Sequence, residues 1–276
     1  MSGFSEYDQY DGLGLAALVR QGDVTAEELL DEAIVRTEQV NGELNAVVYK
    51  FYDQARQTIA KGLPDGLFTG VPFLIKDLHQ LIEGCPLSNG SNMYRNDIAD
   101  HDSTLVARYK DGGLVIFGRT NSPELGLMPV TEPKAYGASR NPWNTKLTPG
   151  GSSGGASAAV SAGILPVAHA SDGGGSIRIP AAATGLVGLK PSRGRIPFGP
   201  DKAEGWGGQS MNHVVSRTVR DTAAMLDVTG GSEVGEPYSA PEQQSIFLAA
   251  MSHKPDPVKV GIFRDKIGQG DYDADA

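Results

Sequence analysis

Apolar residues along this chain recur with two different spacings, one typical of amphipathic helices and one of buried strands. Thr25 and Glu28 form the capping-box pair that opens many helices, and apolar residues then recur three and four positions apart. This pattern predicts a helix over residues 26–40, ended by Asn41 and Gly42. Similar spacing predicts a helix over residues 218–229, and further helices are expected over residues 52–61, 103–111, 154–163 and 177–184.

Short apolar runs between the predicted helices indicate buried strands. The segment FTGVPFLIKDL is typical of a strand that ends near Lys76, and LVIFG, residues 114–118, predicts a second strand bounded by glycine. Further strands are predicted over residues 165–170, 187–190 and 259–263. Because strands and helices alternate, we expect an α/β fold.

Length, charge and cysteine content narrow the possible functions. The 276 residues are enough for one large domain or two ordinary ones. The formal net charge of −9, with acidic residues spread along the chain, disfavours nucleic-acid binding, so a small or neutral ligand is expected. The single Cys85 cannot form an internal disulfide and is expected to be an apolar filler.

The localisation expected from the sequence is cytoplasmic. The first residues, MSGFSEYDQYDGLG, are too acidic and polar for a signal peptide. No apolar run approaches the roughly 18 residues that a membrane helix requires. We therefore expect a soluble protein that makes no membrane contact.

Three serines lie in two glycine-rich stretches of the chain. Ser152 and Ser153 lie in GGSSGG, residues 150–155, and Ser176 ends DGGGS, residues 172–176. Glycine permits backbone angles closed to other residues and lets backbone N–H groups approach a ligand closely. Such stretches therefore indicate either an anion-binding loop or serine chemistry.

Two common glycine-loop functions fit this sequence poorly. A phosphate loop would need GxxxxGK[ST], which is missing, and the G-x-G-x-x-A match at residues 12–17 follows no strand. Residues 150–154 satisfy the G-x-S-x-G nucleophile elbow, but the preceding WNTKLTP is polar instead of a buried strand. His213 and His253 are conceivable bases, yet each has polar neighbours typical of a surface histidine, and His169 is expected to lie in the core of its strand.

Lys76 is a third candidate base, because it stands at the end of an apolar run. Burial would disfavour its ammonium form and lower its pKa. The alternative, in which Lys76 pairs with Asp77 or extends into solvent, is equally compatible with this segment alone.

Taken together, these residues resemble the amidase signature family. The glycine- and serine-rich block from Gly150 to Pro180, which ends in DGGGSIRIP, carries the resemblance, and GVPFLIKD around Lys76 resembles the family's lysine motif. TEP with NPWN, within residues 131–144, is most similar to the bacterial branch that includes cyclic-dimer nylon-oligomer hydrolases. The resemblance implies the amidase signature fold, with a central mixed β-sheet and helices on both faces.

The resemblance also implies roles for individual residues. Ser176 would be the nucleophile, Ser152 a bridging serine that follows a cis peptide bond, and Lys76 the base. The backbone N–H groups of the nucleophile loop would form the oxyanion hole. These groups belong to Gly173, Gly174, Gly175 and Ser176.

Three further residues are expected to support this site. Ser153 is predicted mainly as the N-cap of the following helix, with a hydrogen-bonding role in the serine network as the alternative. Asp172 and Arg178 flank the nucleophile and are expected to pair and hold its loop. The family commonly has threonine or isoleucine where Gly173 stands, so the loop is expected to be unusually loose.

The function implied is hydrolysis of a carboxamide C–N bond through an acyl-serine intermediate, with no metal or cofactor. The alternatives are the amidase subunit of a tRNA-dependent amidotransferase and a catalytically silent binding protein. Expected partners are a small-molecule amide and either a second copy of the chain or a complementing C-terminal segment. Because family members are longer, we expect an N-terminal portion of the fold, incomplete in this chain. Its parts are a helical region at 1–65, a catalytic core at 66–230, and a polar connector with the next strand at 231–276.

Overall fold

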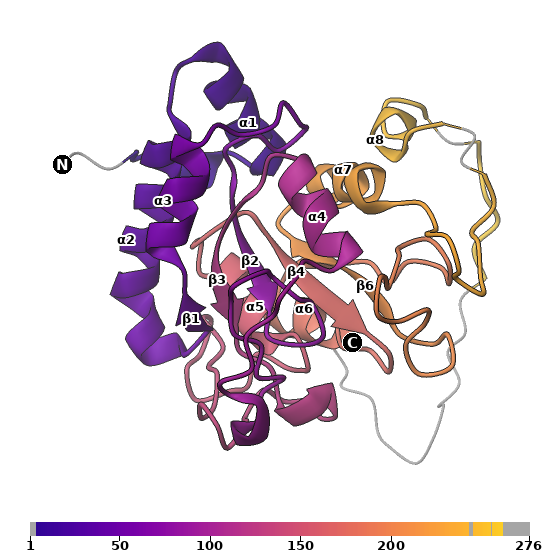
Figure 1. The fold of residues 1–276 in the computed structure, drawn as a ribbon. Helices are drawn as coiled ribbons and strands as arrows, with labels where there is room; N and C mark the ends of the chain where they lie inside the picture. The colour runs from indigo at the N-terminus through magenta and orange to yellow at the C-terminus, as the bar shows by residue number, and fades with distance from the viewer. Residues whose placement is uncertain (1–3, 243–244, 255, 262–276) are drawn as a thin grey trace.

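The described part of the chain is an α/β fold, as the sequence predicted, and its strands form two three-stranded sheets (Figure 1). The computed structural model describes residues 4–242, 245–254 and 256–261. In the first sheet, β3 (Val115–Thr120) lies between β1 (Val47–Lys50) and β2 (Pro72–Lys76). It pairs with β1 in antiparallel and with β2 in parallel orientation, so this sheet is mixed.

The second sheet is antiparallel and includes a strand that the sequence patterns did not predict. That strand, β6 (Met211–Ser216), lies between β4 (Val167–Asp172) and β5 (Val187–Gly188). The surface position expected for His213 is wrong, because β6 buries this histidine completely, whereas His253 is exposed. All six residues of β6 are buried, so tertiary packing covers the polar neighbours from which a surface position of His213 was expected.

The two sheets meet where β2 and β4 lie side by side (Figure 1). The contact is made through a side chain, because the backbone N–H of Lys76 donates to Nδ1 of His169 at 3.2 Å. His169 is fully buried there, as expected for a core residue of its strand. All five residues of β2 are buried, so the strand delivers its last side chain, that of Lys76, into the interior.

The helices pack around these sheets. Figure 1 shows α2 and α3 together on one side, while α7 packs on β6 with α4 and α8 beside it, and α5 contacts strands of both sheets. The α-helices are α1 (Gly12–Gln21), α2 (Ala26–Leu44), α3 (Tyr52–Ala60), α4 (Thr104–Asp111), α5 (Gly154–Ser161), α6 (Arg178–Thr184), α7 (Val219–Thr229) and α8 (Phe247–Ala250). Three short 3₁₀ helices are η1 (Tyr7–Gln9), η2 (Asn92–Tyr94) and η3 (Glu124–Gly126). No helix in the described ranges is long and apolar enough to cross a membrane.

The end predicted for α2 at Asn41 and Gly42 is wrong. The helix continues to Leu44 and ends at Asn45, which adopts a left-handed conformation with φ of 47°. The side chain of Asn41 stabilises the exit instead, because its Oδ1 accepts the N–H groups of Ala46 and Val47. The capping box at the start of α2 is present as predicted.

Helix α1 was missed because its beginning depends on a residue far away in the sequence. The carboxylate of Asp221, in α7, accepts the N–H groups of Gly12 and Leu13 at 2.7 and 3.0 Å. Asp11 caps the same turn by accepting from Gly14. A helix that begins with glycines has a low propensity to form by itself. The hydrogen bonds from Asp221, more than two hundred residues away in the sequence, stabilise its first turn.

The strand predicted at 259–263 does not form in its described part. Residues 259–261 are exposed and have no strand assignment, and residues 262 and 263 lie outside the described residues. Val260 is 78% exposed, so this apolar run has found no sheet neighbour among the described residues. Cys85, in contrast, is buried in the hydrophobic core as predicted.

Candidate active site

Lys76 is completely buried at the end of β2, surrounded by hydroxyl groups. Its Nζ lies 2.7 Å from Oγ of Ser152, 3.0 Å from Oγ of Ser153 and 3.1 Å from Oγ of Ser171. These serines come from the glycine-rich stretch at 150–155 and from β4, so the cluster joins three segments that are distant in sequence.

The surroundings of Lys76 favour its neutral form. Burial lowers the pKa of Lys76 from 10.5 to about 7, although the charge of Asp172 acts in the opposite direction. The alternative of a pair between Lys76 and Asp77 is wrong, because the carboxylate of Asp77 accepts the N–H groups of Ser88 and Gly90. Near pH 7, a large fraction of Lys76 is therefore an amine able to accept a proton.

Ser152 is positioned by a tightly packed backbone. It is 1% exposed, and the Gly151–Ser152 peptide bond is cis. A Cβ at Gly151 would lie 2.6 Å from the backbone N of Val130, so only glycine fits there. This glycine therefore serves close packing of two backbone segments around Ser152.

Ser153 does not act as a helix cap, so that prediction is wrong. It occupies the position before α5, but its side chain makes no capping hydrogen bond. Its hydroxyl instead lies beside Lys76 Nζ and donates to the backbone O of Ser171 at 3.2 Å. The contact with Lys76 explains why the cap is missing, because the Ser153 side chain cannot face both Lys76 and the first turn of α5 at once.

Ser171 is a member of the cluster that the sequence analysis missed. A signal was present, since side chains two apart on a strand share a face and both His169 and Ser171 lie on the face of β4 that contacts Lys76. That signal needed the knowledge that β4 packs beside β2, which the sequence did not supply.

Asp172 and Arg178 form an ion pair that holds the loop around Ser176. Both distances, Nε to Oδ2 and Nη2 to Oδ1, are 2.9 Å. The Asp172 carboxylate also accepts the N–H groups of Gly175 at 2.8 Å and Ile177 at 3.1 Å. Burial alone would raise the pKa of Asp172, but these hydrogen bonds lower it to about 2.

The set of oxyanion-hole donors expected from the resemblance needs one correction. The N–H of Gly175 already donates to Asp172, so it is not free to face a substrate. The N–H groups of Gly173, Gly174 and Ser176 make no hydrogen bond to any described residue. These three remain as candidate donors.

The nucleophile loop is packed, so the looseness expected from Gly173 is wrong. A Cβ at Gly173 would lie 2.9 Å from the ring of Trp206. The indole therefore occupies the space that a threonine or isoleucine side chain would need. In this chain the missing side chain is compensated by an aromatic ring from another segment.

Ser152 and Ser176 line a common cavity of about 30 Å³. The backbone N–H of Ser153 donates to the backbone O of Ser176 at 3.2 Å, which ties the two glycine-rich stretches together. The hydroxyl of Ser176 makes no hydrogen bond within the described residues. A relay between the two serines would therefore require Ser176 to form a new hydrogen bond with Ser152, and such catalytic hydrogen bonds often form only when substrate binds.

Comparison with known proteins identifies the family. The family model described as Amidase matches residues 28–275. The chain belongs to the amidase family. The resemblance seen in the sequence motifs is thereby confirmed, and the fold agrees with that of solved amidases. The structure of a 6-aminohexanoate cyclic dimer hydrolase complexed with substrate has a TM-score of 0.85 and 40% identity, over 90% of this chain and 52% of that chain.

Two curated relatives with similar sequences are longer than this chain. The 6-aminohexanoate-cyclic-dimer hydrolase of Paenarthrobacter ureafaciens is 42% identical over 256 residues, which are 91% of this amidase and 52% of the relative. The lipoamidase of Enterococcus faecalis is 46% identical over 225 residues, 81% of this amidase and 30% of the relative. The chain thus spans about half the length of the cyclic-dimer hydrolase and 30% of the length of the lipoamidase.

Replacing Asp172 with asparagine is expected to destabilise the amidase by about 2–3 kcal/mol at pH 7. The carboxyl of Asp172 has a pKa of about 2 in the folded state, below its usual value of 3.8. Its contribution is therefore fully present above pH 4 and is lost as the pH falls through 2. Urea unfolding at pH 7, 4 and 2.5 measures the difference. Asp65→Asn, at an exposed position, is the control. If the difference in free energy of unfolding between Asp172→Asn and the unmodified protein stayed constant with pH, the low pKa of Asp172 would be contradicted.

Proposed function

We propose that this amidase hydrolyses a carboxamide C–N bond through an acyl-serine intermediate on Ser176, with Ser152 and Lys76 as proton carriers. The observation that carries the proposal is the buried Nζ of Lys76, 2.7 Å from Ser152 Oγ, at a cavity that Ser176 also lines. A buried amine hydrogen-bonded to one serine hydroxyl is suited to activating a second serine without histidine.

The proposed reaction moves one proton along this row of groups. Neutral Lys76 accepts the proton of Ser152, which takes the proton of Ser176 as the Ser176 oxygen bonds to the amide carbon. The C–N bond then breaks, and the leaving nitrogen receives a proton back through Ser152. Water repeats the steps on the resulting ester and releases the acid. The backbone N–H groups of Gly173, Gly174 and Ser176 are the proposed donors to the oxygen that becomes negative.

The proposed substrates are small non-peptide amides, linear or cyclic. The names of two similar proteins support this class, since one is a 6-aminohexanoate-cyclic-dimer hydrolase and the other a lipoamidase. The test is to incubate the protein with the cyclic dimer and with a lipoyl amide, and to quantify newly formed primary amine with and without a chelator. Amine release insensitive to the chelator is expected. A requirement for added metal, or no release from any amide, would count against the proposal.

Ammonia release within a tRNA-dependent amidotransferase is a weaker candidate. The solved glutamyl-tRNA(Gln) amidotransferase protein from Thermotoga maritima has a TM-score of 0.71 but only 26% identity. The cyclic dimer hydrolase reaches 40% identity with a TM-score of 0.85. Glutaminase activity that appears only with added partner proteins of such an amidotransferase would reverse this preference.

A further inference from the structure

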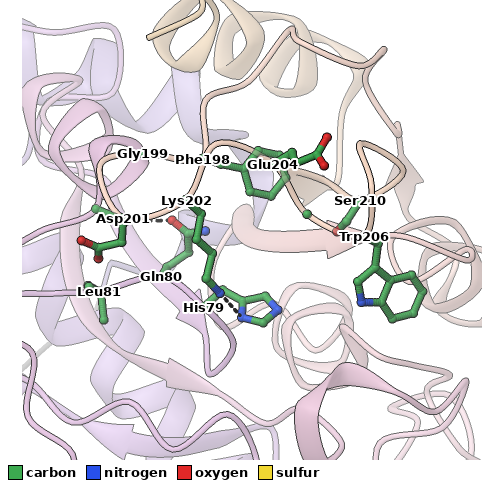
Figure 2. Close-up of a pocket in the computed structure, with 12 residues that line it drawn as sticks. His79, Gln80, Leu81, Phe198, Gly199, Asp201, Lys202, Glu204, Trp206 and Ser210 are labelled. Carbon is green, nitrogen blue, oxygen red and sulfur yellow. Dashed lines mark hydrogen bonds between the residues drawn. The ribbon is translucent and has the colours of Figure 1, made fainter. Parts of the chain in front are cut away.

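A larger pocket of about 260 Å³ adjoins the catalytic cavity (Figure 2). We call it the side pocket. It shares His79, Trp206 and Ser210 with the cavity that Ser152 and Ser176 line, so the two spaces have a common wall. The side pocket is therefore the space next to an amide bound at Ser176.

Lys202, whose side chain is exposed, lies in the lining of the side pocket. Lys202 forms no ion pair with any residue in the described ranges, and its Nζ reaches to 3.4 Å from Nδ1 of His79. Two carboxylates are nearby. Asp201 is hydrogen-bonded to His101 at 3.0 Å. Figure 2 shows the carboxylate of Glu204 pointing away from Lys202 and His79, and its buried Oε2 has no hydrogen-bond partner among the described residues.

His79 is held in place by its backbone and by Lys202. Its φ of 64° is unusual for a residue other than glycine, and its N–H donates to Oδ1 of Asn89 at 2.9 Å. Although His79 is exposed at its edge, desolvation of the ring, with the charges of Lys202 and Lys76, lowers the pKa of His79 to about 4, so the ring is neutral at pH 7.

The contact with Lys202 also decides which ring nitrogen of His79 carries the proton. An ammonium can only donate, so Nδ1 must accept and the proton lies on Nε2. In Figure 2 this second nitrogen is on the side of the ring that faces Trp206. The side pocket thus offers an ammonium and an imidazole N–H, both suited to a carboxylate, and its lining also includes the apolar rings of Phe198 and Trp206.

We propose that the side pocket binds a carboxylate carried by the amide substrate. Lys202 supplies the positive charge, His79 supplies the N–H, and Phe198 and Trp206 contact the aliphatic part of the substrate. This inference rests on the proposed function and predicts that, among small amides, those that bear a carboxylate bind more tightly than neutral ones such as the cyclic dimer. His79 and Lys202 act here as specificity-determining residues.

The test is a binding measurement on Ser176→Ala, which does not require turnover. The probes are 6-acetamidohexanoate and its neutral methyl ester, compared by calorimetry at low salt. The carboxylate is expected to bind about tenfold more tightly than the ester. Lys202→Gln in the same background should remove this preference, and Lys202→Glu should reverse it. Lys61→Gln changes the net charge equally at an exposed site outside the side pocket and should leave the preference unchanged.

The possible outcomes separate this inference from the proposed function. Equal affinity for the two probes, binding of neither probe, or a preference that survives in Lys202→Gln would overturn the carboxylate subsite. Failure of the proposed function would instead appear as a missing covalent adduct between Ser176 of the unmodified protein and a fluorophosphonate probe. To place the carboxylate, adipic acid mono-anilide carries it on the acyl side and 4-(hexanoylamino)benzoate on the amine side. Lys202→Gln should weaken binding of at least one of them about tenfold.

Discussion

Replacing Ser176 with alanine is expected to abolish covalent labelling of this amidase by a fluorophosphonate probe. The probe reacts with a serine only when a nearby base removes its proton, and Lys76 and Ser152 are the groups placed to do so. Hydrolysis of amides should fall by about 10⁴-fold or more, since loss of a nucleophile has effects of this size in serine hydrolases. Intact-mass spectrometry before and after labelling measures the adduct directly.

The matched control for this experiment is Ser192→Ala, which removes an exposed hydroxyl and should be labelled like the unmodified protein. Peptide mapping of the unmodified protein should locate the adduct on Ser176. An adduct of equal yield in Ser176→Ala, or one mapped to Ser152 or Ser153, would show that the roles of the serines are wrongly assigned.

Replacing Lys76 with methionine is expected to reduce the rate of labelling by the fluorophosphonate probe almost as completely as Ser176→Ala does. Methionine fills a similar volume but cannot accept a proton. In the unmodified protein the rate should rise as the pH increases through about 7, because the pKa of Lys76 is about 7 and only the amine form is a base. Labelling rates between pH 5.5 and 9 test this. A flat profile, or the same profile in Lys76→Met, would remove Lys76 from the mechanism.

The same substitution has a consequence for stability that is independent of turnover. The pKa of Lys76 in the folded state, about 7, lies below its value of about 10.4 in an unfolded chain. The unfolded state therefore binds more protons between these values, and the free energy of unfolding of the unmodified protein rises with pH by about 4 kcal/mol over this interval. Lys76→Met lacks this rise. The exposed Lys61→Met serves as control, and parallel pH profiles for both variants would contradict the burial of a neutral lysine.

Much of the local structure was accessible from the sequence because it is recorded in short-range patterns. The predicted helices at 52–61 and 218–229 correspond to α3 and α7, since their apolar spacing marks a buried face. The segment FTGVPFLIKDL predicted a strand with Lys76 at its end, and β2 is that strand. The motifs around Ser152 and Ser176 indicated the amidase family, which the comparisons confirm.

The tertiary structure decided what each of these residues contacts. The hydroxyl of Ser153 could cap α5 or join the lysine, and the position of β2 beside β4 selects the lysine. Likewise, only the folded chain places Trp206 against Gly173.

By itself, then, the sequence determined the family, most helices and strands, and the residue types available for chemistry. The proximity of Lys76 to Ser152, the engagement of Gly175 by Asp172, and the side pocket formed with Lys202 were decided only by the tertiary structure. The physical reason is that periodicity and motifs report which side of a segment is buried. Hydrogen bonds over 2.7–3.3 Å depend on how distant segments pack, and that packing results from the whole core.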